Sequence, residues 1–288
     1  MLTIFTPAYN RAGTLPRLFE SLMRQSCLDF EWLIIDDGSQ DDTQAVVDGF
    51  TKTAGFPLRY HKKENGGKHT AYNMALELAQ GEWFFCVDSD DILADEAVKM
   101  ILKTAETLTD NQGIIAYKSD FSGKRLSGEF PENLEQTGMN ELVLKHGCSG
   151  EFTLIFPTAL ARKYPFPVFA GERFVTESVV YDRLDPVCRM YLLRETVMIC
   201  EYQADGYSQN INGIIARNPK GYSMYFMQRI DVYPSFKQKI ITAGKYWCFR
   251  WMGDKPSVRY TGKHRFLTGL CLPLGLVFQV YYKLVRGF

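Results

Sequence analysis

The sequence predicts an α/β protein whose mainly parallel sheet is flanked by helices and followed by a helical C-terminal extension. Over the first 120 residues, short β-rich runs alternate with amphipathic helical stretches, and this alternation implies right-handed crossovers between parallel strands. The chain has 288 residues, of which 46% are hydrophobic, so it is long and apolar enough to bury a large core.

The elements of the first 120 residues follow from the spacing of apolar side chains. Helical stripes with intervals of three and four residues lie over residues 15–23 and 71–78. A further short helix should begin at Asp41 or Asp42, either of which can cap it. Between the helices, β-rich runs predict strands over residues 2–6, 32–35, 58–61 and 83–87.

The second half of the sequence is less regular. Residues 120–150 contain several glycines and predict a loop-rich segment. The elements expected after it are a strand over residues 152–156, a helix over 175–184, a strand over 197–202 and helices over 219–252, broken near Pro234.

Charge is balanced over the whole chain but not along it. The 33 basic and 33 acidic residues cancel, which argues against a general nucleic-acid binder because such proteins carry a clear basic excess. Residues 244–288 nevertheless hold eight basic residues and one acidic residue. We therefore expect this basic tail to meet an anionic surface.

The cysteines and the N-terminus favour a cytoplasmic protein. The seven cysteines are scattered and form no C-x-x-C pair, so we expect free thiols in a reducing compartment. The first residues run directly into Pro7 and predict a strand in place of a signal peptide.

Three carboxylates follow the fourth expected strand. Asp88, Asp90 and Asp91 lie within four residues, and such groups repel one another unless a cation neutralises them. Carboxylate oxygens at a strand end suit Mg²⁺ or Mn²⁺. The alternative is an acidic first turn of a helix over residues 92–100.

Two further polar clusters follow other strands. Asp36 and Asp37 precede Gly38 and Ser39, and carboxylates there can accept hydrogen bonds from a ribose or a base; the alternative is a plain Asp/Gly/Ser turn. The run Asn-Gly-Gly-Lys at residues 65–68 can bring backbone N–H groups and a positive charge to an anion. It lacks the P-loop spacing, and no G-x-G-x-x-G motif is present.

Together these motifs resemble those of the family 2 glycosyltransferases of the GT-A fold, of the type that builds bacterial surface polysaccharides. The resemblance includes the run Thr-Pro-Ala-Tyr-Asn-Arg at residues 6–11. All four motifs occur in the family's order, over about the first 120 residues. The family implies transfer of a sugar from a nucleotide donor, which we expect to be a UDP-sugar, usually with inversion at the anomeric carbon.

The resemblance also implies roles for individual residues. Asp88, Asp90 and Asp91 would hold a Mn²⁺ or Mg²⁺ ion, with Asp90 also counted as catalytic. Such an ion can neutralise the charge that develops on a departing nucleoside diphosphate. The residues expected to bind the nucleotide sugar are Thr6, Ala8 and Asp37, which would line the base and ribose pocket, with Asn10, Arg11, Asp36, Ser89, Asp88 and Lys68, the last near the diphosphate.

Inversion by a single attack needs one general base. The family usually carries it in the second half, in an acidic motif at the start of a helix. Glu177 is the nearest match, although Ser178 stands where many relatives have Asp. Asp182 and Asp185 are alternatives, and Glu177 could instead be an acidic residue in a first helical turn without a catalytic role.

The resemblance divides the chain by function. Residues 1–120 would form the nucleotide-sugar-binding half of a GT-A domain, residues 121–218 the acceptor-binding half, and residues 219–288 the extension. Within the second part, the polar segment 203–210 resembles one that some relatives fold over donor and acceptor.

The end of the extension predicts contact with a membrane surface. Residues 266–282 are uncharged, but Pro273 and Gly275 interrupt them, and a spanning helix needs about 20 apolar residues. We expect an interfacial segment, peripheral on the inner face of the cell membrane. The alternative is a helix packed on the body or on a partner subunit. The basic residues expected to anchor it are Lys255, Arg259, Lys263 and Arg265.

Two rival functions use similar features. A catalytically inactive glycosyltransferase-like protein that binds nucleotide sugars or serves as a scaffold would keep the same motifs. A sugar-1-phosphate nucleotidylyltransferase has a related sheet, but its Gly-rich, Arg-containing N-terminal loop is missing here. The acceptor we expect is a glycan or a lipid-linked glycan, and an oligomer is compatible with the sequence.

Overall fold

The computed structural model describes residues 1–200, 211–252 and 258–286. It contains two compact units. One comprises Met1–Pro165 with the segment that begins at Leu184, and the other comprises Phe166–Arg183 with the described residues after position 210. The functional division at residues 120 and 218 stays a prediction.

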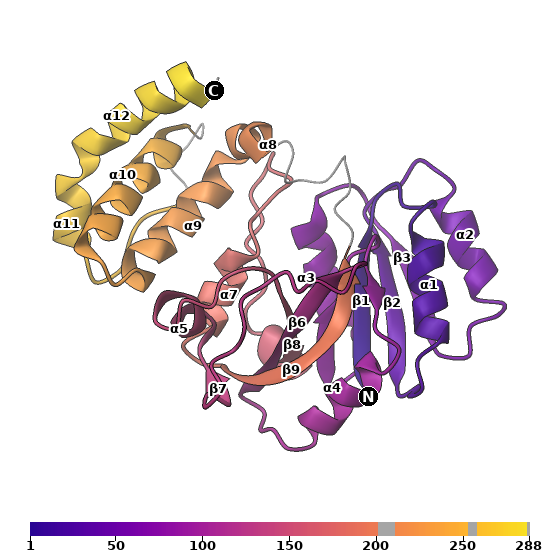
Figure 1. Ribbon diagram of the computed structural model, residues 1–288. Helices are drawn as coiled ribbons and strands as arrows, with labels where there is room; N and C mark the ends of the chain where they lie inside the picture. Colours follow the sequence, from indigo (N-terminus) through magenta and orange to yellow (C-terminus); the bar gives the residue numbers. More distant parts are fainter. Residues whose placement is uncertain (201–210, 253–257, 287–288) are drawn as a thin grey trace. The chain divides into compact units, whose positions relative to one another are not determined.

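Within its described residues, the first unit holds one mixed sheet of nine strands (Figure 1). The strands are β1 (Leu2–Ala8), β2 (Phe30–Asp36), β3 (Leu58–Lys62), β4 (Trp83–Cys86), β5 (Ile92–Leu93), β6 (Gln112–Asp120), β7 (Gln136–Thr137), β8 (Phe152–Pro157) and β9 (Arg189–Cys200). Their order is β3-β2-β1-β4-β8-β6-β9-β5, and β7 pairs with β9. The first four are parallel neighbours, while β8 is antiparallel to both β4 and β6.

Helices cover both faces of the parallel strands, because side chains on a strand alternate between the two faces. On one face, Ile4 and Trp32 belong to a buried cluster with residues of α1, α2 and α4. On the other face, Tyr72 of α3 packs edge-on against Phe5 and Phe84. The helices are α1 (Leu15–Met23), α2 (Thr43–Phe50), α3 (Lys68–Leu78), α4 (Ala97–Ala105), α5 (Met139–Leu144) and α6 (Thr158–Ala161).

The strand order creates a natural ligand position. From β1 the chain passes to β2 and β3 on one side and then returns to β4 on the other side. Open α/β sheets bind ligands at the carboxyl ends of strands where the order reverses in this way. The segments that follow β1, β2, β3 and β4 carry the predicted motifs.

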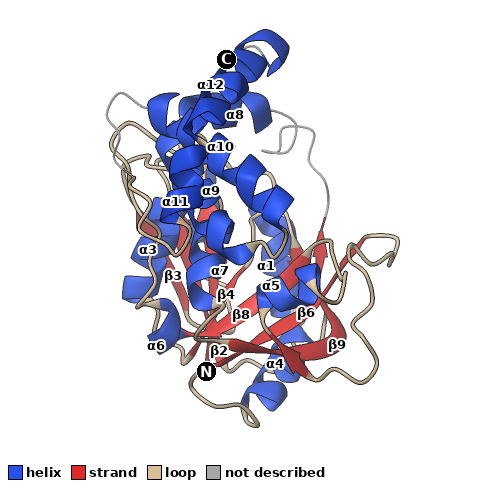
Figure 2. Cartoon of the chain, turned by 90° about the vertical axis from the view of Figure 1, so that its left-hand side faces the viewer, coloured by secondary structure: helices blue, strands red, loops and turns tan. Residues whose placement is uncertain are grey.

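The described secondary structure of the second unit is helical (Figure 2), and it follows an irregular stretch over residues 166–177. Its elements are α7 (Ser178–Leu184), α8 (Ile211–Arg217), α9 (Pro219–Val232), α10 (Phe236–Met252), α11 (Arg265–Leu270), α12 (Leu272–Tyr281) and the π-helical turn η2 (Tyr282–Arg286). Helix α10 packs against both α9 and α12. In the ranges that the structure describes, no helix combines the length and the apolar character needed to cross a bilayer.

Two glycines allow α10 and α12 to approach closely. A Cβ atom on Gly244 would lie 2.9 Å from Cβ of Leu274, and one on Gly275 would lie 2.6 Å from Cβ of Trp247. Both distances are shorter than real Cβ contacts, so a larger residue at either position would push the helices apart.

Most predicted elements are confirmed. The strands expected over residues 2–6, 32–35, 58–61, 83–87 and 152–156 are β1, β2, β3, β4 and β8, and the helices expected over 219–252 are α9 and α10, which end and begin around Pro234. The α/β class with a helical C-terminal region is therefore confirmed.

Three features of the second half differ from expectation. Helix α5 and strand β7 lie inside the segment predicted as loops. Strand β9 begins at Arg189, well before the expected residue 197. The sequence pattern did not reveal its first part, because the pairing with β6 shifts register between Ala116 and Lys118 and interrupts the alternation that marks a strand. The segment 203–210 and Lys255 lie outside the described residues.

Candidate functional site

The candidate site is built from loops at the carboxyl ends of β1, β2 and β4 and from the loop between β3 and α3. The β1 and β2 strands are in register up to Ala8 and Asp36. Just beyond, the backbone N–H of Asp37 donates to the carbonyl oxygen of Ala8 at 2.8 Å. The loops after the two strands therefore start side by side.

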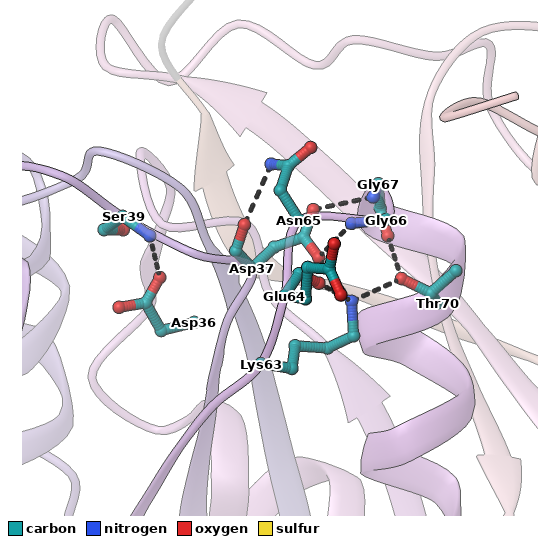
Figure 3. Close-up of polar contacts among 9 residues, drawn as sticks. All are labelled: Asp36, Asp37, Ser39, Lys63, Glu64, Asn65, Gly66, Gly67 and Thr70. Atoms are coloured by element: carbon teal, nitrogen blue, oxygen red, sulfur yellow. Dashed lines mark hydrogen bonds and ion pairs between the residues drawn. The ribbon is translucent and has the colours of Figure 1, made fainter. Parts of the chain in front are cut away.

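Asp37 ties the β2 loop to the glycine-rich loop. Its carboxylate accepts hydrogen bonds from the backbone N–H groups of Gly66 at 2.9 Å and Gly67 at 2.7 Å (Figure 3). The Lys63 ammonium donates to the same carboxylate at 2.6 Å. The side chain of Asp37 is buried, so these donors replace the water it loses. They hold the loop that leads into Lys68.

A glycine is needed beside this contact. Gly38 has φ +86°, and a Cβ atom there would lie 3.1 Å from the backbone nitrogen of Asn65. Both the left-handed backbone and the close approach of the two loops disfavour a larger residue. The Asn65 amide in turn donates to the carbonyl oxygen of Asp37 at 2.8 Å.

Asp36 is an internal anchor. Its side chain is 0% exposed, and its two oxygens accept hydrogen bonds from the Ser39 backbone N–H at 2.7 Å and from the Tyr60 hydroxyl. Burial raises the pKa of Tyr60 above its ordinary value, and the hydrogen bond to the Asp36 carboxylate raises it further. Asp36 therefore holds the loop after β2 in place through its hydrogen bond to Ser39. A direct contact of its side chain with a nucleotide stays a prediction.

Thr6 and Ala8 form the floor of the site. Both are buried, and the Thr6 hydroxyl accepts a hydrogen bond from the Trp32 indole at 2.9 Å. Their side chains support the sheet edge on which the loops rest, and their predicted contacts with base and ribose are untested.

Asn10 and Arg11 join the β1 loop to the β2 loop. Asn10 has φ +53°, a left-handed conformation that Asn tolerates better than most residues. Its backbone N–H donates to Ser39 Oγ and its Oδ1 accepts from the Gln40 N–H, both at 2.8 Å. The Arg11 N–H donates to Thr43 Oγ1 at 2.9 Å. Both predicted residues thus border the site.

Lys68 meets the acidic motif. Its ammonium nitrogen lies 2.7 Å from Oδ1 and 2.9 Å from Oδ2 of Asp88. The side chains are 25% and 42% exposed respectively, so the pair is open to solvent on one side. Desolvation alone would raise the pKa of Asp88, but the Lys68 charge outweighs it and the pKa is lowered. The sequence predicted these two residues separately, and the fold brings them together.

The other two aspartates are poorer at carrying charge. Desolvation, aided by the charge of Asp88, raises the pKa of Asp90. Desolvation likewise raises the pKa of the buried Asp91 to about 7. The positive charge of Lys118 favours a lower pKa at both Asp88 and Asp91. Ser89, between them, is buried.

The alternative interpretation of this motif, an acidic first turn of a helix over residues 92–100, is wrong. Ile92 and Leu93 form strand β5, which pairs with β9, and α4 begins only at Ala97. The aspartates therefore lie in a turn between two strands and do not cap a helix.

The carboxylates of the acidic turn could supply some, but not all, of the oxygen ligands of a hard cation. No group of three His, Cys, Asp or Glu side chains among the described residues is arranged to hold a metal ion. Asp88 and Asp90 are both partly exposed carboxylates. Desolvation, and after it the charge of Asp88, raises the pKa of Asp90, and a nearby cation would favour its charged form. This suits Mg²⁺ or Mn²⁺ bound by one or two carboxylates and by phosphates of a ligand.

Besides Lys118, two basic residues at the site were not predicted. Lys63 neutralises Asp37, and Arg17 of α1 donates to the carbonyl oxygen of Asp90 at 2.6 Å. Lys63 follows a strand and could have been suspected from its position next to the glycine-rich loop. Arg17 gives no such signal, because only the tertiary fold brings α1 to the acidic turn.

The three candidate bases differ sharply. Glu177, which precedes α7 in the second unit, is exposed. Asp182 is buried, and its Oδ2 lies 3.0 Å from Nε of Arg229. Asp185 accepts hydrogen bonds from the backbone N–H and the side-chain amide of Asn140 at 3.1 and 3.2 Å. Asp182 and Asp185 are thus engaged in structural contacts.

Curated relatives match parts of the chain. A PGL/p-HBAD biosynthesis glycosyltransferase of Mycobacterium tuberculosis is 36% identical over 93 residues, which cover 32% of this chain and 36% of the relative. The chondroitin synthase of Pasteurella multocida is 37% identical over 217 residues, 75% of this chain and 18% of the relative. The chain therefore spans only about a third or less of the length of these relatives.

Solved structures match nearly the whole chain. TarS of S. aureus, in complex with UDP-GlcNAc, has a TM-score of 0.61 at 15% identity, covering 98% of this chain and 91% of that chain. The mannosyltransferase PcManGT of Pyrobaculum calidifontis, in complex with GDP-Man and Mn²⁺, has a TM-score of 0.56 at 18% identity, covering 99% of this chain and 80% of that chain. These likenesses confirm the GT-A type of fold.

The family itself follows from the match to a family model. The model described as glycosyl transferase family 2 matches residues 3–166. This stretch is more than half of the 288 residues and contains every motif on which the resemblance was based, from Thr6 to Asp91. The chain belongs to glycosyl transferase family 2.

Proposed function

We propose that the chain transfers a sugar from a UDP-sugar to a glycan or lipid-linked glycan, with inversion at the anomeric carbon. The observation that carries the proposal is the contact between Lys68 and Asp88, which joins a positive charge and a carboxylate at the carboxyl edge of the sheet. A nucleoside diphosphate needs both kinds of group: a cation directly, and a carboxylate through a metal ion.

The loops around Asp37 would position the donor. Because Asp37 fixes the backbone of Gly66 and Gly67, Lys68 at the start of α3 projects from a held loop. A preorganised cation stabilises developing negative charge without the cost of reorganising at the moment of reaction. Arg17, through the carbonyl oxygen of Asp90, would hold the acidic turn in place.

Asp88 and Asp90 would hold a Mn²⁺ or Mg²⁺ ion, with Asp91 beside them. When bound, such an ion supplies Lewis-acid neutralisation of the two phosphates. The raised pKa of Asp90 supports this assignment, because a cation would favour the charged carboxylate there. The PcManGT and glucosyl-3-phosphoglycerate synthase structures, both similar in fold, contain Mn²⁺.

Glu177 would act as the general base. It takes the proton of the acceptor hydroxyl at a carboxylate oxygen while that hydroxyl oxygen forms a bond to the anomeric carbon. The bond from the anomeric carbon to the diphosphate oxygen breaks, and its electron pair leaves with the diphosphate. Glu177 is exposed, whereas Asp182 is buried and Asp185 is half-buried, and this difference in exposure supports the choice.

The names of similar proteins support the substrate classes. The structures that resemble this fold include complexes with UDP-GlcNAc, with GDP-Man and with UDP. Of these, UDP and UDP-GlcNAc favour a uridine nucleotide. The curated relatives include a chondroitin synthase and a PGL/p-HBAD biosynthesis glycosyltransferase, and the first of these favours a glycan acceptor.

A donor panel tests the proposal. We expect one UDP-sugar to raise the melting temperature in the presence of Mn²⁺, and to release UDP on adding acceptor or, more slowly, water. Asp90→Asn should abolish release, whereas Asp95→Asn, on the exposed surface, should not. Glu177→Gln should keep donor binding and lose turnover. Donor binding without turnover in the unaltered chain would identify an inactive binding protein instead, and no binding of any nucleotide sugar would refute the proposal.

A further inference from the structure

Helices α11 and α12 and the turn η2 expose a large apolar surface. Phe266 is 80% exposed, Leu270 63% and Leu284 78%. Contiguous exposed apolar surface of this kind marks an interaction site, whereas single exposed apolar residues do not. We call this the apolar tail face; its members are Phe266, Leu270, Leu272, Leu276, Val277, Val280, Tyr281, Leu284 and Val285.

The apolar tail face is not the face that holds the helices in their unit. Thr268, Cys271 and Gly275 are buried on the opposite side, where α12 packs against α10. Trp247 of α10 donates from its indole to the carbonyl oxygen of Thr268 at 2.7 Å. A helix that is apolar on both sides belongs in an interior or against an apolar phase. The outward side chains therefore require a partner that the described residues of the unit do not supply.

Positive charge lies next to this surface. Arg259, Lys263, Arg265 and Lys283 are exposed, and residues 255–288 contain no Asp or Glu. An apolar face with basic residues at its border is the pattern of an interfacial element that meets anionic lipid.

The same charges disfavour a second copy of the chain as the partner. In a twofold dimer through the apolar tail face, the same patch would meet itself, and the basic border of one copy would approach that of the other. Like charges in such a contact repel, whereas anionic headgroups attract them.

We propose that the apolar tail face binds the surface of an anionic bilayer, with its apolar side chains at the level of the acyl-chain boundary and its basic side chains among the headgroups. This proposal does not rest on sugar transfer, because it uses only side chains of the second unit. It assigns the extension to interfacial binding.

Vesicle co-sedimentation tests the proposal. The full chain should bind vesicles of phosphatidylcholine with 30% phosphatidylglycerol and bind pure phosphatidylcholine vesicles at least about tenfold more weakly, since each basic residue near an anionic surface adds roughly fivefold. Binding should weaken as salt rises. Phe266→Gln/Leu284→Gln should weaken binding at least about tenfold, and Lys263→Glu/Arg265→Glu should remove the preference for anionic vesicles.

Matched controls keep the test specific. Leu28→Gln and Lys52→Glu alter an exposed apolar and an exposed basic residue of the first unit and should leave vesicle binding unchanged. Unaltered circular dichroism and thermal shift with the donor would show that the tail variants are folded. Equal binding by the tail variants would overturn the proposal. So would absence of vesicle binding together with a dimer, seen by sedimentation, that Phe266→Gln/Leu284→Gln dissociates.

Discussion

The Lys68 ammonium contacts both oxygens of Asp88, at 2.7 and 2.9 Å, although Lys68 begins helix α3 and Asp88 lies in the turn after β4. The pair holds the N-terminal turn of α3 against the acidic turn after β4, which creates a site with positive and negative groups side by side.

Removing the Lys68 charge should reduce turnover. In Lys68→Ala we expect kcat/KM to fall by about 100-fold, because one preorganised group that stabilises a developing anion contributes on that scale. Lys68→Arg should recover part of the loss, since it restores the charge with different geometry. UDP release measures the effect, and Lys52→Ala, at an exposed position, is the control. Activity within threefold in Lys68→Ala would argue against a role at the diphosphate.

Asp37→Asn should destabilise the first unit. The carboxylate accepts two backbone N–H groups and the Lys63 ammonium, and an amide would direct its NH₂ group at one of these donors. We expect a loss of about 3 kcal/mol in the free energy of unfolding, typical of a broken buried charge network. Urea denaturation measures it. Asp48→Asn, exposed on α2, should change stability by less than about 0.5 kcal/mol.

His69 should make stability depend on pH. Desolvation lowers its pKa from 6.5 to about 4 in the folded chain, so between these values the unfolded state binds more protons. The contribution of neutral His69 to the free energy of unfolding should therefore be fully present above pH 6.5 and be lost as the pH drops toward 4. The loss should be at most about 1.4 kcal/mol for each unit by which the folded and unfolded pKa values differ. Urea denaturation at pH 7.5 and 5 should show a smaller drop for His69→Gln than for the unaltered chain. His61→Gln should retain the full drop; the same drop in both variants would contradict the assignment.

The Asp182–Arg229 pair should be structural. Both side chains are largely buried, so Arg229→Met would leave a buried carboxylate without its nearest cation, at a cost of about 3 kcal/mol. Glu177→Gln, at an exposed position, should change stability by less than about 0.5 kcal/mol while turnover is lost. If Asp182→Asn were folded but lost turnover, and Glu177→Gln kept turnover, Asp182 would be the base instead.

Two glycines of the second unit should respond in opposite ways to alanine. At Gly275 a Cβ would lie 2.6 Å from Trp247 Cβ and 3.2 Å from the backbone nitrogen of Cys248, whereas at Gly269 nothing lies within 4 Å. Gly275→Ala should therefore cost about 1–3 kcal/mol through overpacking. Gly269→Ala, inside α11, should be neutral or stabilising by up to about 1 kcal/mol. Equal effects, measured by thermal denaturation, would show that α10 and α12 do not pack this closely.

The parallel half of the sheet was predictable because its signals are local. Ile4, Trp32 and Phe85 lie in short apolar runs whose period and flanking turn residues reveal buried strands. The motifs after those strands could likewise be assigned to one edge, since parallel strands end on the same side. Strand β9 was predicted only at its end, because charged residues such as Arg194 and a register shift against β6 disturb its pattern.

By itself, the sequence determined the α/β class, the family resemblance, the order of the motifs and the basic, apolar tail, since each depends on residue types and their spacing along the chain. Only the tertiary structure decided that Lys68 binds Asp88, that Lys63 neutralises Asp37, that Arg17 supports the acidic turn and that Asp182 is paired with Arg229. These contacts join residues that are 20 to 73 positions apart. Hydrogen bonds and ion pairs act over a few ångströms in space, and a sequence records proximity along the chain alone.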